Sequence, residues 1–188
     1  HLEHRRQRQM CIRDRSVTDH YSTASICGPN SKKILNKLFP NLDLSDENFP
    51  HMSFKEDKLE NINCRIMRIS FTGELSYEIN IESKYGNSLW KMCIEAGKEF
   101  NLTPYGTETM HLLRAEKGFI IVGQDTDGTM TPSDLQMDWI VSKKKYDFIG
   151  KRSLYRSDTI REDRKQLVGL LTDDPKEILE EGAQIVSD

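Results

Sequence analysis

Strict alternation of apolar and polar side chains from Leu75 to Ile81 is the feature that most constrains how this chain folds. In an extended strand, one side would carry Leu75, Tyr77, Ile79 and Ile81, and the other side Ser76, Glu78 and Asn80. A helix would scatter these side chains around its axis, so the pattern predicts a β-strand with one face in a core. It follows that the neighbours Tyr77 and Glu78 point to opposite faces of the sheet.

A second strand is predicted just before it. Cys64–Phe71 is rich in apolar residues and is separated from Leu75 by Thr72-Gly73-Glu74, where Gly73 supplies the positive φ that a tight hairpin needs. The preceding residues 41–61 are rich in Asp, Glu, Asn and Lys. We therefore expect a surface connection there, followed by an antiparallel hairpin.

Helices alternate irregularly with these strands. They are predicted over residues 29–38, 83–97 and 107–117. Pro29 suits a first helical position after a strand at 22–27, Ser83 is an N-cap candidate, and Gly118 stands where a C′ glycine ends a helix. Mixed element order with hairpin chemistry predicts an α+β fold.

The second half of the chain alternates short apolar runs with polar loops. Strands are predicted at Phe119–Val122, Trp139–Val141 and Gln166–Leu171, a polar loop at Gly123–Ser133, and a short helix at Gly150–Tyr155. These patterns suggest an α+β domain over 16–155, a linker over 156–164, and the incomplete start of a further domain over 165–188.

The first 15 residues are interpreted as foreign to the fold. Met10–Asp14 reads as one frame of a sequencing adapter, and the basic stretch before it has no apolar pattern. We expect 1–15 to be a disordered, non-native scar; the rival interpretations are a native basic arm and an Arg-rich transit peptide.

Charge and composition exclude several classes of protein. The formal net charge is −3, and the scattered Lys and Arg form no basic stripe for nucleic acid. No apolar stretch approaches the roughly 18 residues that span a bilayer, so no membrane partner is expected. Cys27, Cys64 and Cys93 lack CxxC spacing, which indicates reduced thiols in the cytoplasm.

Asp125 and Asp127 invite a calcium interpretation that their spacing excludes. A calcium loop starting at Asp125 would need Gly at its sixth position and Glu at its twelfth, where this chain has Met130 and Gln136. The side chains of both aspartates are instead expected to cap amides of their own loop, and no metal site is predicted. The basic run 143–145 is either a solvated face or an anion-binding element.

Three long motifs resemble one known family. They are TGELSYEI from Thr72, YGTETMHLLRAEKG from Tyr105 and VGQDTDGTMTP from Val122. Together they resemble the folate-binding aminomethyltransferase family, which includes the T-protein of the glycine cleavage system. Within it, RAEKGFIIVGQDTDGT and RKQLVGLLT are similar to the C-terminal part of the alpha subunits of heterotetrameric sarcosine oxidases. This resemblance implies that the domain over 16–155 is partial and that 165–188 is the truncated start of a small β-barrel-type C-terminal domain.

The resemblance implies a set of site residues. Glu78 matches the family's pterin-holding Glu, with Tyr77 beside it as either a second folate contact or a core residue. Gly73, Arg114, Glu116, Asp125 and Asp127 would support the site, Arg114 and Glu116 as an ion pair. Met110 replaces an Arg that contacts folate in the T-proteins. The family's catalytic Asp would lie upstream, so no catalytic residue is assigned here.

The resemblance also implies an activity: oxidation of sarcosine to glycine and hydrogen peroxide, with one-carbon transfer to tetrahydrofolate giving 5,10-methylenetetrahydrofolate. FAD, FMN and NAD would bind elsewhere in a complex with beta, gamma and delta subunits, and this segment alone would be inactive. Three alternatives remain: a dimethylglycine or sarcosine dehydrogenase, a glycine-cleavage aminomethyltransferase, or a non-catalytic protein that keeps the fold for assembly, including iron–sulfur assembly.

Overall fold

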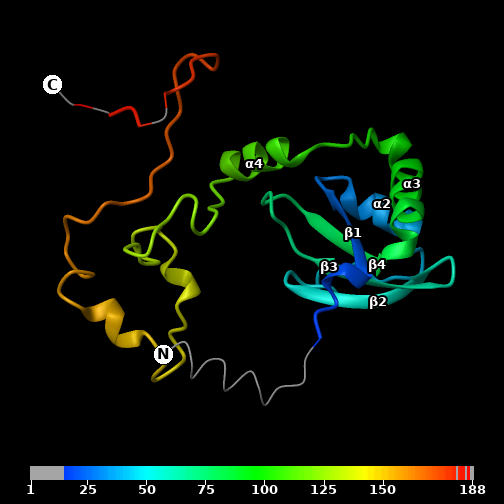
Figure 1. Cartoon of the computed structure of the whole chain (residues 1–188), viewed down its shortest axis with the longest axis horizontal. Helices are drawn as coiled ribbons and strands as arrows, with labels where there is room; N and C mark the ends of the chain where they lie inside the picture. Colours follow the sequence, from blue (N-terminus) through cyan, green and yellow to red (C-terminus); the bar gives the residue numbers. More distant parts are fainter. Residues whose placement is uncertain (1–14, 181, 185, 187–188) are drawn as a thin grey trace. The chain divides into compact units, whose positions relative to one another are not determined.

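The structure is a computed structural model that describes residues 15–180, 182–184 and 186. The chain divides into two compact units, which meet in sequence between Phe119 and Ile120. The predicted scar at 1–15 lies outside the described residues except for Arg15. Figure 1 shows that the labelled strands and α-helices all belong to the first unit.

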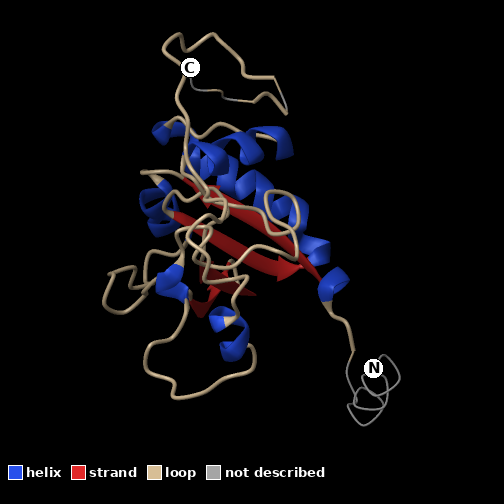
Figure 2. Cartoon of the chain, turned by 90° about the vertical axis from the view of Figure 1, so that its left-hand side faces the viewer, coloured by secondary structure: helices blue, strands red, loops and turns tan. Residues whose placement is uncertain are grey.

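Four antiparallel strands form one sheet in the first unit. They are β1 (Tyr21–Cys27), β2 (Ser53–Leu59), β3 (Ile62–Arg68) and β4 (Ser76–Glu82), in the order β1-β4-β3-β2, and Figure 2 draws them in red. Ile79 of β4 lies opposite Ala24 on one side and Ile66 on the other. Because all three are apolar and buried, the register puts one sheet face into the core.

Two helices cover that face. Helices α2 (Ser31–Leu38) and α3 (Gly86–Gly97) pack against each other and against β1 and β4 (Figure 1). Their buried apolar side chains are Ile34 and Leu35 from α2 and Leu89 and Cys93 from α3. The first unit is therefore a sheet-and-helix sandwich, which confirms the α+β expectation for this part of the chain.

The described chain has one further α-helix and several 3₁₀ turns. They are α4 (Thr107–Glu116) and the 3₁₀ turns η1 (Thr18–His20), η2 (Ser83–Tyr85), η3 (Lys98–Phe100), η4 (Asp138–Ile140) and η5 (Lys151–Tyr155). Gly118 has φ of +73°. Its N–H donates to Ala115 O, and the N–H of Phe119 donates to Arg114 O, both at 2.9 Å. This pair of bonds is a Schellman end, so the predicted C′ glycine of α4 is confirmed.

The two strands of the predicted hairpin do pair with each other, but no tight turn connects them. Strands β3 and β4 are antiparallel neighbours, but residues 69–75 join them. The tight turn lies one strand earlier, where Glu60 and Asn61 take φ of +47° and +70° between β2 and β3. Strand β2 was missed because Lys55 and Asp57 occupy positions where an apolar residue would give the strand signal.

Two helix starts also differ from prediction. Helix α2 begins at Ser31, so Pro29 lies in the preceding turn rather than at a first helical position. Ser83 does not cap α3, because its hydroxyl donates to Asp19 O at 2.5 Å and the η2 turn separates it from Gly86. In both cases, residues predicted to form the first turn of the α-helix lie instead in a separate turn before the helix.

The strands predicted after α4 are wrong. Phe119–Val122, Trp139–Val141 and Gln166–Leu171 contain no strand; η4 covers part of the second segment, and η5 replaces the predicted helix at 150–155. A strand needs a partner for its backbone groups, and no described segment pairs with these. Many of their apolar side chains are exposed, 83% for Val122 and 100% for Leu171, while Ile120, Ile121 and Val141 are half-buried. The C-terminal β-barrel-type domain remains a prediction.

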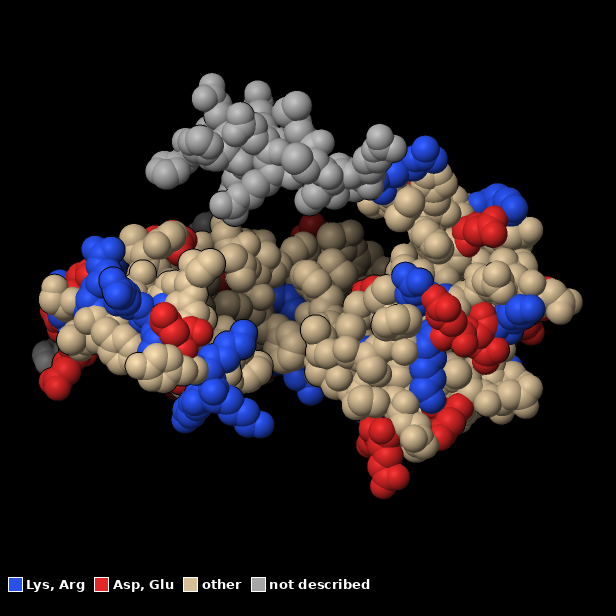
Figure 3. All heavy atoms as spheres, turned by 90° about the horizontal axis from the view of Figure 1, so that it is seen from below, with Lys and Arg blue, Asp and Glu red and all other residues tan. Residues whose placement is uncertain are grey.

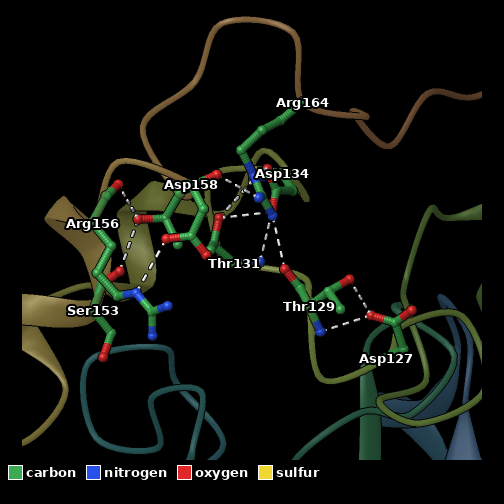
Figure 4. A network of polar contacts seen from close by, with 9 residues as sticks. Asp127, Thr129, Thr131, Asp134, Ser153, Arg156, Asp158 and Arg164 are labelled. Atoms are coloured by element: carbon green, nitrogen blue, oxygen red, sulfur yellow. Dashed lines mark hydrogen bonds and ion pairs between the residues drawn. The ribbon is translucent and has the colours of Figure 1, made fainter.

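A buried carboxylate organises the second unit. Asp134 is 1% exposed and accepts hydrogen bonds from Arg164 Nε and Nη2 at 2.7 and 2.5 Å and from Thr131 N at 2.7 Å (Figure 4). Arg164 Nη2 also donates to Thr129 O at 2.7 Å. The hydrogen bonds from Arg164, with those of Thr131, hold the pKa of Asp134 well below its usual range. The segment around Arg164, predicted as a linker, is thus tied to the 129–134 loop.

Surface charge is mixed. On the face shown in Figure 3, Lys and Arg lie interspersed with Asp and Glu.

Among the helices of the described chain, none is both long enough and apolar enough to cross a membrane.

Candidate functional site

A cavity of about 880 Å³ in the first unit lies along strand β1. Its wall includes successive β1 residues from Thr23 to Cys27, Ser76 and Glu78 of β4, and the segment 100–107 that leads into α4. Ligand pockets typically measure a few hundred to about 1,000 Å³. This cavity is therefore of a size that holds a small organic molecule.

Glu78 is the carboxylate that the strand presents to this cavity. It lies mid-strand between Ser25 of β1 and Met67 of β3. In the described part of the chain, its carboxylate makes no hydrogen bond or ion pair, and it is half-buried. Burial raises its pKa. A partly desolvated acceptor without donors is suited to a ligand that brings N–H groups.

The rest of the lining is apolar or neutral. Phe71, Trp90, Met110 and Leu113 line the cavity, and the described lining residues include no Lys, Arg or His. Glu74 also lines it, but its carboxylate is paired with Lys117 Nζ at 2.8 Å. Among the described lining residues, Glu78 is thus the charged side chain that has no oppositely charged partner.

Tyr77 lies on the other side of the sheet. Its side chain is 0% exposed, and its ring centroid is 5.8 Å from that of Phe49 in the core. Its hydroxyl has no hydrogen-bond partner among the described residues, and burial raises its pKa. The predicted opposite orientation of Tyr77 and Glu78 is confirmed, and Tyr77 does not line the cavity.

Gly73 and Arg114 both lie at the C-terminal end of α4. Gly73 has φ of +81°, and a Cβ there would lie 2.9 Å from Lys117 Cβ and 3.0 Å from Phe119 Cε1. Arg114 is 8% exposed and donates from Nη1 to Phe119 O at 3.1 Å. Gly73 thus lets the loop that enters β4 approach the end of α4 closely, and Arg114 fixes the chain directly after α4. Glu116, in contrast, is exposed.

Asp125 and Asp127 belong to the second unit. Ile121 N donates to Asp125 Oδ2 at 2.7 Å, and Thr129 N donates to Asp127 Oδ1 at 2.8 Å. Hydrogen bonds from Thr129 lower the pKa of Asp127. The predicted capping of a loop amide is confirmed for Asp127, whereas Asp125 caps the amide of Ile121, just before the loop. Within the residues that the structure describes, no group of three or more His, Cys, Asp or Glu side chains could hold a metal ion.

Tyr105 and Cys27 are cavity residues that the sequence did not reveal. The Tyr105 hydroxyl lies 2.9 Å from Cys27 Sγ, and burial together with this contact strongly raises the Tyr105 pKa. They are 78 positions apart, and although Tyr105 begins one of the quoted motifs, nothing in the sequence connects it with Cys27. Only the alternation in β1, which leaves Cys27 on the Ser25 side, hinted that this thiol faces away from the core.

Comparison with known proteins places this arrangement in a family. The chain is 56% identical over 174 residues to the sarcosine oxidase subunit alpha of Corynebacterium sp. (strain P-1) and 38% identical over 181 residues to that of Rhizobium meliloti (strain 1021). These alignments cover 92% and 95% of this chain but 18% of each relative. An aminomethyltransferase of Halothermothrix orenii is 35% identical over 140 residues, 74% of this chain and 38% of the relative.

These relatives confirm both parts of the resemblance drawn from the sequence. The chain spans about a fifth of the length of the sarcosine oxidase subunits that it matches. The GCVT N-terminal domain matches residues 1–145, which is more than half of the chain. The chain therefore belongs to the GCVT N-terminal domain family.

Proposed function

We propose that the first unit forms part of a tetrahydrofolate site, in which the Glu78 carboxylate anchors the pterin ring. An ionised carboxylate offers two acceptor oxygens, which match the ring N–H and exocyclic amine of a 2-aminopyrimidinone in a bidentate pair. The observation that carries the proposal is a half-buried Glu78 without a donor in the described chain, facing the cavity.

The cavity wall suits the rest of such a ligand. Phe71, Tyr105 and Met110 offer apolar surface for a flat ring system. The absence of cations among the described lining residues favours a neutral ring over the folate carboxylates in this cavity. Tyr77 takes no part in contact; it fixes the strand from the core, so that Glu78 is held in place.

We further propose that the whole protein is a sarcosine oxidase of which this chain is a segment. The reaction is an oxidative demethylation: sarcosine becomes glycine, molecular oxygen is reduced to hydrogen peroxide, and the methyl carbon passes to tetrahydrofolate as 5,10-methylenetetrahydrofolate. The cofactors FAD, FMN and NAD would bind to parts of the complex outside this segment. The complex would include beta, gamma and delta subunits and would lie in the cytoplasm. The names and identities of the two sarcosine oxidase subunits support this choice.

Other members of the family are the second candidates. Met110 stands where the T-proteins carry a folate-contacting Arg, which favours the oxidase over a glycine-cleavage aminomethyltransferase. Iron–sulfur assembly proteins of this fold carry a Cys directly after the Lys-Gly pair, and here Lys117-Gly118 is followed by Phe119.

Calorimetric titration with tetrahydrofolate under anaerobic conditions tests the anchor. It is done on this chain and on the longer protein to which we assign it. Glu78→Gln keeps one acceptor oxygen and loses the charge, so affinity should fall roughly 10- to 100-fold. Glu82→Gln is the matched control, because Glu82 lies on the same strand and outside the cavity. Equal affinity of Glu78→Gln and the parent would overturn the assignment.

A further inference from the structure

The second unit has a cavity of its own, of about 530 Å³. It lies between the loop that begins at Thr131 and the η5 segment, and Lys143, Lys145 and Lys151 reach it. None of the residues predicted to support a folate site lines it. It is therefore a separate place to look for a ligand.

The cavity carries an excess of positive charge. Asp138 is the carboxylate among its described lining residues, against three ammonium groups. In the described part of the chain, Lys143 and Lys145 have no carboxylate partner. Lys151 donates to Tyr146 O, and its Nζ lies 5.3 Å from the centroid of the Tyr146 ring. Two lysines are thus uncommitted and a third is held in place.

Neutral donors stand beside these lysines. Ser133, Ser142 and Tyr155 line the cavity with hydroxyls that make no hydrogen bond within the described residues. Thr131 is fixed by its bonds to Asp134, at 2.7 Å from its N and 2.9 Å from its Oγ1. A cavity wall that offers ammonium and hydroxyl donors is suited to a ligand group that only accepts hydrogen bonds, such as a carboxylate or a phosphate.

We propose that this cavity binds an organic or inorganic ion with several oxyanion groups, either carboxylates or phosphates. Charge-assisted hydrogen bonds from Lys143 and Lys145 would hold two of these groups, with the free hydroxyls completing their coordination. Phe148 and Leu154 give the cavity apolar surface that accepts the carbon part of an organic anion. The site is independent of the folate proposal, because it shares no residue with the Glu78 cavity.

Calorimetric titration of the full chain with citrate and with tripolyphosphate tests this site at low and at moderate salt. These two probes separate a carboxylate ligand from a phosphate ligand. Glu78→Gln, measured in parallel, should bind both probes as the parent does. A loss there would mean that the two cavities are not independent and would overturn the proposal.

Three variants sharpen the test. Lys143→Gln and Lys145→Gln should each weaken binding of the preferred probe by roughly tenfold. Lys144→Gln is the matched control, because Lys144 lies between them in the sequence but does not line the cavity, and it should change affinity less than about twofold. Circular dichroism checks that each variant keeps its fold.

Two results would overturn the proposal. One is that neither probe binds the parent chain. The other is that Lys144→Gln weakens binding as much as Lys143→Gln does, because the attraction would then come from general surface charge. The site is supported if the parent chain binds one probe more tightly and only Lys143→Gln and Lys145→Gln weaken that binding. The preferred probe, citrate or tripolyphosphate, then identifies the ligand class.

Discussion

Tyr77 and Glu78 are adjacent in strand β4, and their side chains lie on opposite faces of the sheet. Tyr77 is fully buried against Phe49, whereas Glu78 faces the cavity beside β1. The strand thus joins a core residue to a cavity-lining carboxylate through one peptide bond. Any shift of the strand by one residue would exchange their places.

Glu78→Gln should stabilise the protein in the absence of ligand. Burial raises the pKa of Glu78, so the folded state binds more protons than the unfolded state above the ordinary Glu pKa of about 4.3. The ionised side chain therefore opposes folding at neutral pH, and its cost fades as the pH falls through the folded pKa toward that value. Thermal unfolding at pH 7 should show a midpoint roughly 1–4 °C higher in the variant. A lower midpoint would contradict a desolvated Glu78.

Tyr77→Phe separates packing from ligand contact. The Tyr77 hydroxyl is buried without a hydrogen-bond partner among the described residues. Its removal should leave the free energy of unfolding unchanged or raise it by up to about 1 kcal/mol. Tetrahydrofolate affinity should change less than about twofold, whereas a tenfold loss would mean that the hydroxyl contacts the ligand. Urea unfolding and calorimetry measure the two quantities.

Gly73→Ala should destabilise the first unit through two separate effects. The φ of +81° costs a non-glycine residue about 1–2 kcal/mol, and the new Cβ would lie 2.9 Å from Lys117 Cβ. Displacing that neighbour adds roughly 1–3 kcal/mol. Gly118→Ala is the control, because Gly118 has φ of +73° and a Cβ added there would meet nothing within 4 Å. Urea unfolding that gives equal losses for both variants would show that Gly73 is not a packing position.

Asp134→Asn should remove an acid-dependent step in the stability of the second unit. Hydrogen bonds from Arg164 lower the pKa of Asp134, so its contribution is fully present above the unfolded value of about 3.9. That contribution is lost as the pH falls through the lower folded pKa. Limited proteolysis of the 129–167 region from pH 7 to pH 2 should show faster cleavage of the variant at neutral pH, with the difference shrinking in acid. A difference that stays constant with pH would contradict the ion pair.

The sequence by itself determined the central strand and its faces. Alternation from Leu75 to Ile81 placed Tyr77 in the core and Glu78 outside it, because side-chain period is a local property of extended backbone. Gly118 likewise marked the end of α4, since few residues other than glycine take φ of +73° without strain.

Tertiary structure decided where strands exist and which residues meet. The apolar run Phe119–Val122 has strand composition but no pairing partner in the described chain, whereas the charged segment Ser53–Leu59 becomes a strand because β3 pairs with it. The contacts Tyr105–Cys27 and Arg164–Asp134 join residues 78 and 30 positions apart. Local pattern cannot foresee them, because backbone pairing and salt bridges depend on what the folded chain brings near.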